Sequence, residues 1–133
     1  MRYLLDTNIC IYLIKKKPLQ LIEHITSISI DDIGISSITL GELEYGVEKS
    51  MHQARNRDAL NEFLVPLNIY PFDSLAARIY GNIRADLEKR GKTIGSLDMM
   101  IGSHALSLEL ILVTNNVREF SRIDNLQIEN WTK

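Results

Sequence analysis

Short, largely apolar runs that alternate with helical patterns constrain this chain more than any other feature. The runs are Tyr3 to Leu5, Ile33 to Ile35, Ile69 to Phe72 and Leu110 to Val113. A strand that is covered on both faces has such a continuous apolar pattern, whereas a strand with one wet face alternates. The sequence therefore predicts an α/β fold with a central, mostly parallel sheet and helices on both sides, in three α/β/α layers.

Helical segments fill the intervals between these runs, and most have a recognisable first residue. Side chains that accept hydrogen bonds from free amides cap helix starts, proline favours the first turn, and glycine often ends a helix. One more amphipathic helix is expected between Met51 and Pro66. The expected caps or starts are Thr7 or Asn8, Pro18, Ser36 or Ser37, Asp73 and Ser96, and Gly91 is an expected end.

Length and composition indicate one ordinary globular domain over residues 1–133. Hydrophobic residues make up 45% of the chain and charged residues 24%, which excludes disordered, collagen-like and coiled-coil proteins. The formal net charge of −2 indicates no strongly basic nucleic-acid surface. Because there is one cysteine, Cys10, and no apolar stretch near the ~20 residues of a membrane helix, we expect a cytoplasmic protein.

Polar side chains follow the predicted strands at their carboxyl ends, where parallel sheets form their sites. Asp6 directly follows the first strand, and Asn116 follows the last strand after Thr114. Glu42 lies early in the helix after the second strand, and Asp98 lies in the first turn of the helix that Ser96 starts. We expect these groups to converge on one edge of the sheet.

Glu42 and Asp98 each share a helix face with apolar or small residues. Residues three and four positions apart are neighbours on a helix, which places Gly46 beside Glu42 and Gly102 beside Asp98. A glycine inside a helix costs about 1 kcal/mol relative to alanine. One explanation for both glycines is that they leave space beside an acid.

A cation would relieve the repulsion among gathered acids, since two unit charges 4 Å apart repel by about 4 kcal/mol at an effective dielectric near 20. Carboxylate, amide and hydroxyl oxygens suit Mg²⁺ or Mn²⁺ and do not suit zinc. Such an ion can activate water for attack on a phosphodiester. The alternative is that these acids are ordinary solvated side chains among the 17 of the chain.

Four segments, taken in order, resemble the signature segments of the PIN-domain family, with the closest likeness to VapC-type toxins of bacterial toxin–antitoxin pairs. The resemblance covers essentially the whole chain, and its C-terminal residues from Leu126 to Trp131 are also similar. The four segments are Leu4-Leu5-Asp6-Thr7-Asn8, Gly41 to Gly46, Ile94 to Ala105 and Leu112 to Phe120.

The resemblance implies a PIN-like fold and a Mg²⁺-dependent endoribonuclease that is neutralised by a VapB-type antitoxin and is usually a homodimer. By position, the metal-binding acids are Asp6, Glu42 and Asp98. Thr7 and Thr114 are the hydroxyls that support Asp6.

The fourth acid of many PIN domains is replaced here by Asn116. Its carbonyl can bind a metal or orient a water but brings no charge, while Glu119 either supplies the missing carboxylate or is simply exposed. We therefore expect one firmly held ion and a second that is weak or brought by the substrate.

The resemblance to compact VapC toxins implies that the substrate is a structured RNA, notably initiator tRNA that is cut in the anticodon region. Two rival functions are open on the residues alone. Asp6 could be the nucleophile of a phosphatase, although such enzymes want a second aspartate where this chain has Asn8. A non-catalytic interaction module is the other rival.

Overall fold

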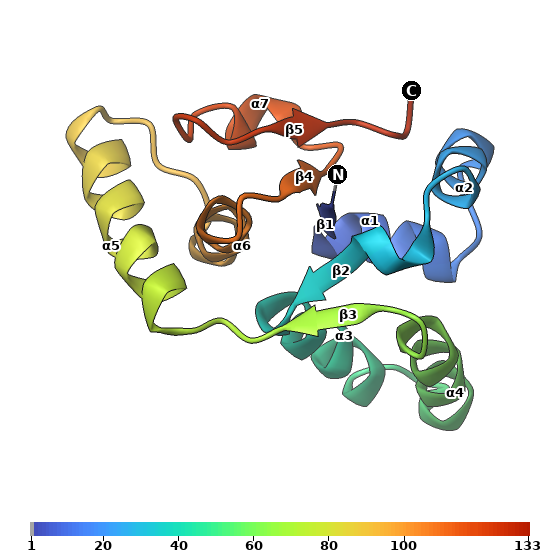
Figure 1. Cartoon of the computed structure of the whole chain (residues 1–133). Helices are drawn as coiled ribbons and strands as arrows, with labels where there is room; N and C mark the ends of the chain where they lie inside the picture. The colour runs from blue at the N-terminus through green and yellow to red at the C-terminus, as the bar shows by residue number, and fades with distance from the viewer. Residues whose placement is uncertain (1) are drawn as a thin grey trace.

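A five-stranded parallel sheet organises the molecule, and the computed structural model describes residues 2–133 (Figure 1). The strand order is β3-β2-β1-β4-β5, and every neighbouring pair is parallel. The predicted α/β class is therefore confirmed. The strands are β1 (Tyr3–Leu5), β2 (Ile33–Ser36), β3 (Asn68–Tyr70), β4 (Ile111–Val113) and β5 (Ile128–Glu129).

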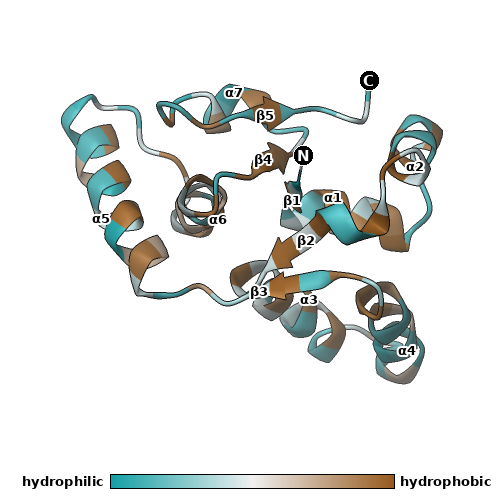
Figure 2. Cartoon of the chain, in the orientation of Figure 1, coloured by the Kyte–Doolittle hydropathy of each residue, from teal (hydrophilic) through white to brown (hydrophobic). Residues whose placement is uncertain are grey.

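Successive side chains of a strand point to opposite faces of the sheet, and this alternation divides the core in two. Leu5 and Val113 belong to one cluster of buried residues, while their neighbours Leu4 and Leu112 belong to the other. Figure 2 shows hydrophobic residues along β2 and β4. The central strands β1, β2 and β4 are buried on both faces, which explains their continuous apolar patterns, whereas the edge strand β3 is largely exposed.

Helices cover both faces and complete the predicted three layers. The first cluster packs under α1 to α4, and the second packs under α5 to α7. Figure 1 shows α5 and α6 on one side of the sheet and α3 and α4 on the other. The helices are α1 (Thr7–Ile14), α2 (Leu19–Thr26), α3 (Ser37–Glu48), α4 (Gln53–Leu64), α5 (Ser74–Lys89), α6 (Ser96–Ser107) and α7 (Val117–Phe120), and a 3₁₀ turn spans Ile30–Asp32.

The helix ends follow local chemistry, with one correction. Ser36 and Asp73 cap α3 and α5 as predicted, and Gly91, whose φ is +66°, ends α5 in the left-handed conformation that glycine favours. The cap of α1 is Asp6, however, and not Thr7 or Asn8: Asp6 Oδ1 accepts a hydrogen bond of 2.9 Å from the amide of Ile9.

Two elements near the C-terminus were not predicted, because α7 has four residues and β5 has two. Their segment packs closely on α6: a Cβ added to Gly102 would lie 2.6 Å from Ile123 Cδ1. Trp131 then anchors the chain end, buried against Tyr3 and stacked on His24 at 4.3 Å. Among the described residues, no helix is long and apolar enough to cross a membrane.

Candidate active site

Asp6 sits at the carboxyl end of the central strand with both carboxylate oxygens held. Oδ1 accepts from the Ile9 amide in the first turn of α1, and Oδ2 accepts from the hydroxyl of Thr114, which follows β4. The residue is only 4% exposed. Burial is the main cause that raises the pKa of Asp6 above its ordinary value, and the two hydrogen bonds oppose that rise.

Glu42 is tied to the neighbouring helix α1. The Thr7 hydroxyl donates to Glu42 Oε1 over 2.7 Å and lies 3.2 Å from the hydroxyl of Thr39. Thr7, which was expected to support Asp6, therefore supports Glu42 instead. The reason is geometric: Thr7 is the first residue of α1, and its hydroxyl faces α3 rather than the strand end.

Asp98 carries the clearest electrostatic signal of the site. Burial raises the pKa of Asp98 to about 6, and nearby negative charges add to the rise. In decreasing order of effect, those charges belong to Asp6, Glu119 and Glu42. Four acids from four separate segments thus share one electrostatic environment, which we call the acid cluster.

The segment after β4 adds two further groups. Glu119, half-buried in α7, is near enough to Asp98 for its charge to raise the pKa of that carboxyl. Asn116 is the residue before α7; its amide N–H donates to the Thr114 hydroxyl over 2.9 Å. Asn115 donates to the hydroxyl of Tyr12 over 3.0 Å, which joins this loop to α1.

The donor set fits a hard divalent cation. Among residues 2–133, no group of three or more His, Cys, Asp or Glu side chains is gathered closely enough to hold a metal ion by itself. Mg²⁺ is commonly held by only one or two protein carboxylates and keeps several waters. Crowded carboxylates that raise the pKa of Asp98, together with the amide oxygen that Asn116 offers, suit such an ion and not zinc.

The explanation that both glycines leave space beside an acid is wrong for Gly102. Its missing side chain admits Ile123 and Phe120 of the C-terminal segment, at 2.6 and 3.4 Å from an added Cβ. Gly46 does face open space, since an added Cβ would meet nothing within 4 Å. Tyr45, on the same face as Glu42, is 65% exposed, so this face of α3 also borders solvent.

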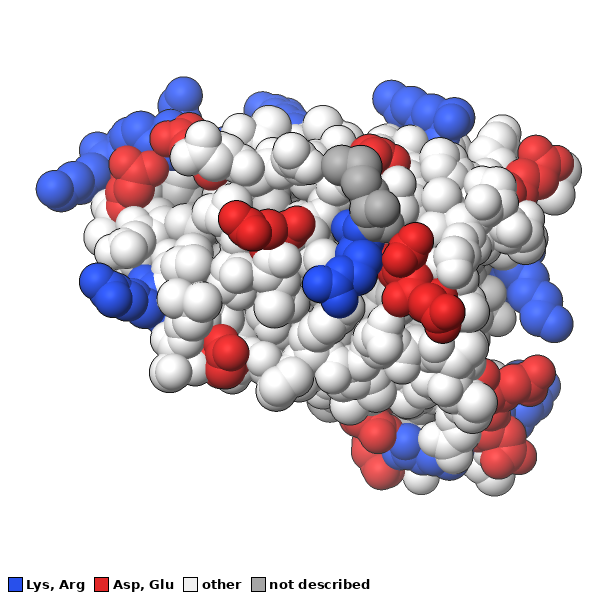
Figure 3. Space-filling model, in the orientation of Figure 1, with Lys and Arg blue, Asp and Glu red and all other residues white. Residues whose placement is uncertain are grey.

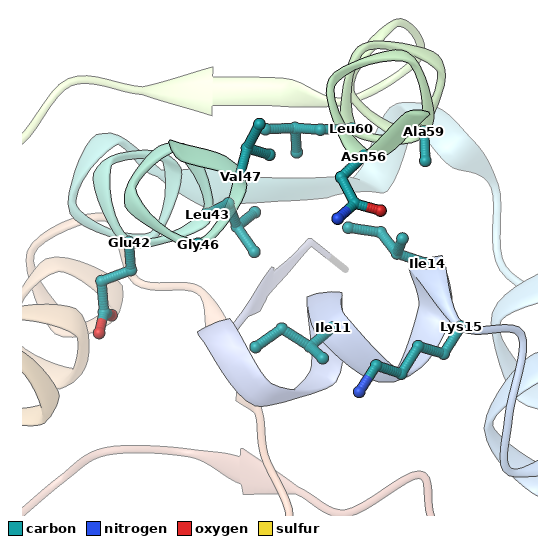
Figure 4. Close-up of a pocket in the computed structure, with 10 residues that line it drawn as sticks. All are labelled: Ile11, Ile14, Lys15, Glu42, Leu43, Gly46, Val47, Asn56, Ala59 and Leu60. Carbon is teal, nitrogen blue, oxygen red and sulfur yellow. The ribbon is translucent and has the colours of Figure 1, made fainter. Parts of the chain in front are cut away.

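An apolar groove of about 290 Å³ runs between α1, α3 and α4 (Figure 4). Figure 4 shows Glu42 at one end, Lys15 at the other and aliphatic side chains between them. Arg57 of α4 pairs with Glu44 and Glu48 of α3, which joins the two helices outside the groove lining. The acid cluster therefore borders a surface that can receive an apolar segment.

Charges are scattered over the face of the molecule in Figure 3, with no broad basic region in that view. This agrees with the net charge of −2. Phosphate contacts would therefore depend on a few cations, and the sequence offers Lys15, Lys16 and Lys17 after α1 and Arg118 and Arg122 in or after α7.

The sequence is similar to known proteins over its whole length. A model of the PIN domain matches residues 3–126. Ribonuclease VapC2 of Rickettsia felis is 45% identical over 134 residues, which cover 100% of both chains. The tRNA(fMet)-specific endonuclease VapC of Shigella flexneri is 42% identical over 99% of both chains.

Solved structures agree with the sequence relatives. A chain in the crystal structure of DNA-bound VapBC from Salmonella typhimurium superposes with a TM-score of 0.93 at 44% identity, over 98% of each chain. A chain of VapBC2 from Rickettsia felis, bound to a promoter fragment, gives a TM-score of 0.92 at 44% identity, over 98% of this chain and 99% of that one. On sequence and on fold, this chain belongs to the PIN domain family, among its VapC members.

Proposed function

We propose that this protein is a metal-dependent endoribonuclease, the toxin of a VapBC-type pair, and that it cleaves a structured RNA. The observation that carries the proposal is that acids from separate segments are held at the carboxyl end of the sheet: Thr114 and the Ile9 amide hold Asp6, and Thr7 holds Glu42. The pKa of Asp98, raised first by burial and then by nearby acids, agrees with this arrangement. Relatives named ribonuclease VapC2 and tRNA(fMet)-specific endonuclease VapC, at 45% and 42% identity, support RNA as the substrate class. We extend this to tRNA as the RNA to test first.

Mg²⁺ is the proposed cofactor, with Mn²⁺ as a substitute. A bound divalent ion supplies a Lewis acid that makes water more acidic and neutralises charge on a phosphate. Asp6, Glu42, Asp98 and Asn116 would hold it, and Glu119 offers a further carboxylate.

The supporting residues of this chain fix the ligand geometry. Thr114 and the Ile9 amide orient Asp6, and Thr7 orients Glu42. With Asn116 in place of a fourth acid, we propose one firmly held ion, and a second ion that is held weakly or arrives with the substrate.

The proposed partners are a VapB-type antitoxin and a second copy of the toxin, in a heteromeric complex. Relatives crystallised as VapBC support the first partner. We assign the groove between α1, α3 and α4 to an apolar antitoxin segment, because its occupant would extend to Glu42 and restrict access to the acid cluster. Co-purification with the antitoxin should then be lost on Ala59→Lys, which places a charge on the half-buried lining of the groove.

The decisive experiment incubates antitoxin-free protein with bulk tRNA in Mg²⁺ and in EDTA. Discrete fragments that require Mg²⁺ are expected. Intact tRNA together with hydrolysis of a generic phosphomonoester would favour the rival phosphatase with Asp6 as nucleophile. Silence in both assays would favour a non-catalytic interaction module.

A further inference from the structure

A buried hydrogen bond joins α6 to the start of α3. His104 Nδ1 lies 2.7 Å from Ser36 Oγ, although the two residues are 68 positions apart in the chain. His104 is 1% exposed and Ser36 is fully buried. The ring also packs edge-on against Phe72, with 5.4 Å between ring centroids. The contact is therefore shielded from solvent and packed against an aromatic ring.

A histidine is an unfavourable choice for this position if packing is the only requirement. Its second ring nitrogen, Nε2, is buried and has no hydrogen-bond partner among the described residues. An unsatisfied buried polar atom destabilises the folded state, and burial lowers the pKa of His104. An aliphatic side chain would avoid these costs, so the directional bond to Ser36 is the feature that distinguishes histidine here.

Ser36 connects this bond to the frame of α3. Its Oγ accepts from the Ile38 amide over 3.0 Å and so caps the helix. The same hydroxyl thus holds the first turn of α3 and the last turns of α6. Among the described residues, this is the only side-chain hydrogen bond that joins the start of α3 to α6.

Each of these helices carries one acid of the cluster, and the two acids are the same number of residues away from the bond. Glu42 is six residues after Ser36, and Asp98 is six residues before His104. Six residues span ~9 Å of helix at 1.5 Å per residue. A tilt of about 10° at the Ser36–His104 contact would therefore move either acid by ~1.5 Å, and errors near 1 Å can cost about a hundredfold in rate.

We infer that the Ser36–His104 hydrogen bond fixes the angle between the helices that carry Glu42 and Asp98, and that His104 is a positioning residue of the active site. His104 touches neither substrate nor metal. The role at the site rests on the proposed function, whereas the effect on the helix angle does not.

The test compares three substitutions of His104 with one control. His104→Leu removes the bond at similar volume. His104→Asn places an amide where Nδ1 stood and should restore the bond, while His104→Gln places its amide near Nε2 and should not. The control is Ser103→Ala, because Ser103 is equally buried on α6 but bonds only to the Met99 carbonyl of its own helix.

The first readout is the distance between spin labels on α3 and α6, which needs no activity. Tyr45→Cys and Leu97→Cys provide exposed attachment points, and Cys10 is buried and stays unlabelled. His104→Leu and His104→Gln should shift or broaden the distance distribution, whereas His104→Asn and Ser103→Ala should not. An unchanged distribution in His104→Gln overturns the proposal, even where His104→Leu does not fold.

The second readout separates the site from the fold. The Kd for Mn²⁺ and the kcat for tRNA cleavage should each worsen by about tenfold in His104→Gln, with KM unchanged and with recovery in His104→Asn. If the wild-type protein neither binds Mn²⁺ nor cleaves tRNA, the proposed function fails while the distance measurement still decides the helix angle. If His104→Gln shifts the distance but leaves Kd and kcat unchanged, the positioning role is overturned.

Discussion

Helix α6 carries one ionisable side chain near each end, and the pKa values of the two side chains are shifted in opposite directions. At the first turn, Asp98 is kept among other acids, and burial with their charge raises its pKa to about 6. At the last turn, His104 is enclosed by Ser36 and Phe72, and burial lowers its pKa. Under the functions proposed above, the first turn keeps a charge for chemistry, and the last turn keeps a neutral ring with one unpaired nitrogen for geometry. The raised pKa of Asp98 and the unpaired Nε2 of His104 are both unfavourable for stability, and we assign them to two different purposes.

The strongest test of the first end is Asp98→Asn. Loss of its charge should lower Mg²⁺-dependent cleavage by about 10²–10³-fold, equivalent to about 3–4 kcal/mol in the barrier. Glu62→Gln, an exposed acid of α4 outside the cluster, serves as the control and should leave the rate unchanged. An active Asp98→Asn variant would remove Asp98 from the site.

The middle of α6 sharpens the comparison, because Gly102 lies between the two ends. Gly102→Val should lower the free energy of unfolding by about 2–3 kcal/mol, since its Cβ would collide with Ile123. Gly46→Ala on α3 is the matched control and should stabilise the protein by about 0.5–1 kcal/mol, because its surroundings are open. Denaturant unfolding measures both, and a neutral Gly102→Val would show that the C-terminal segment moves freely.

The pH dependence of stability should identify the Asp98 end directly, in EDTA. Since folding raises the Asp98 pKa from 3.8 to about 6, the native state binds more protons than the unfolded state in that window, and stability falls as pH rises through it. Asp98→Asn should therefore be more stable than wild type by about 1–2 kcal/mol at pH 7.5, after a reduction for partial solvent exposure.

The difference in unfolding free energy between Asp98→Asn and wild type should shrink toward zero as the pH falls to about 4 and below, because the Asp98 carboxyl then becomes protonated in both the folded and the unfolded state. His104 acts in the opposite direction: its lowered pKa removes stability as pH falls below its ordinary value of 6.5. Thermal unfolding at several pH values checks both. A pH-independent gap between the two proteins would mean that folding does not raise the pKa of Asp98.

The smallest expected effect concerns Asn116. Asn116→Asp adds one carboxylate next to the cluster and should tighten Mg²⁺ binding by about tenfold, which is about 1.4 kcal/mol. Isothermal titration measures this, with Asn115→Asp as the neighbouring control. Unchanged affinity in Asn116→Asp would indicate that Glu119 already serves as the fourth acidic position.

Much of the frame was predictable because it depends on local pattern. Continuous apolar runs gave four of the five strands, and Ser36, Asp73 and Gly91 marked helix ends through chemistry that needs only neighbouring backbone. The third strand was displaced slightly, since Asn68–Tyr70 pairs with β2 where Ile69 to Phe72 was expected. The two-residue strand β5 and the short helix α7 were missed because so few residues carry no periodicity.

The candidate site also has a part that could be predicted from the sequence and a part that could not. Asp6, Glu42 and Asp98 could be selected from their places after strands and in helices, whereas their supports could not. Which acid the Thr7 hydroxyl reaches depends on how α1 packs on α3. Whether Glu119 is solvated or joins the cluster depends on where α7 returns to the sheet edge.

The sequence by itself determined the α/β class, the order of the elements and the acids that follow the strands, because periodicity and capping act over a few residues. Only the tertiary structure decided that Thr7 holds Glu42, that Gly102 admits the C-terminal segment and that His104 meets Ser36. These contacts join residues tens of positions apart. Their identity depends on the angles and spacings at which the helices pack, and no local pattern encodes those.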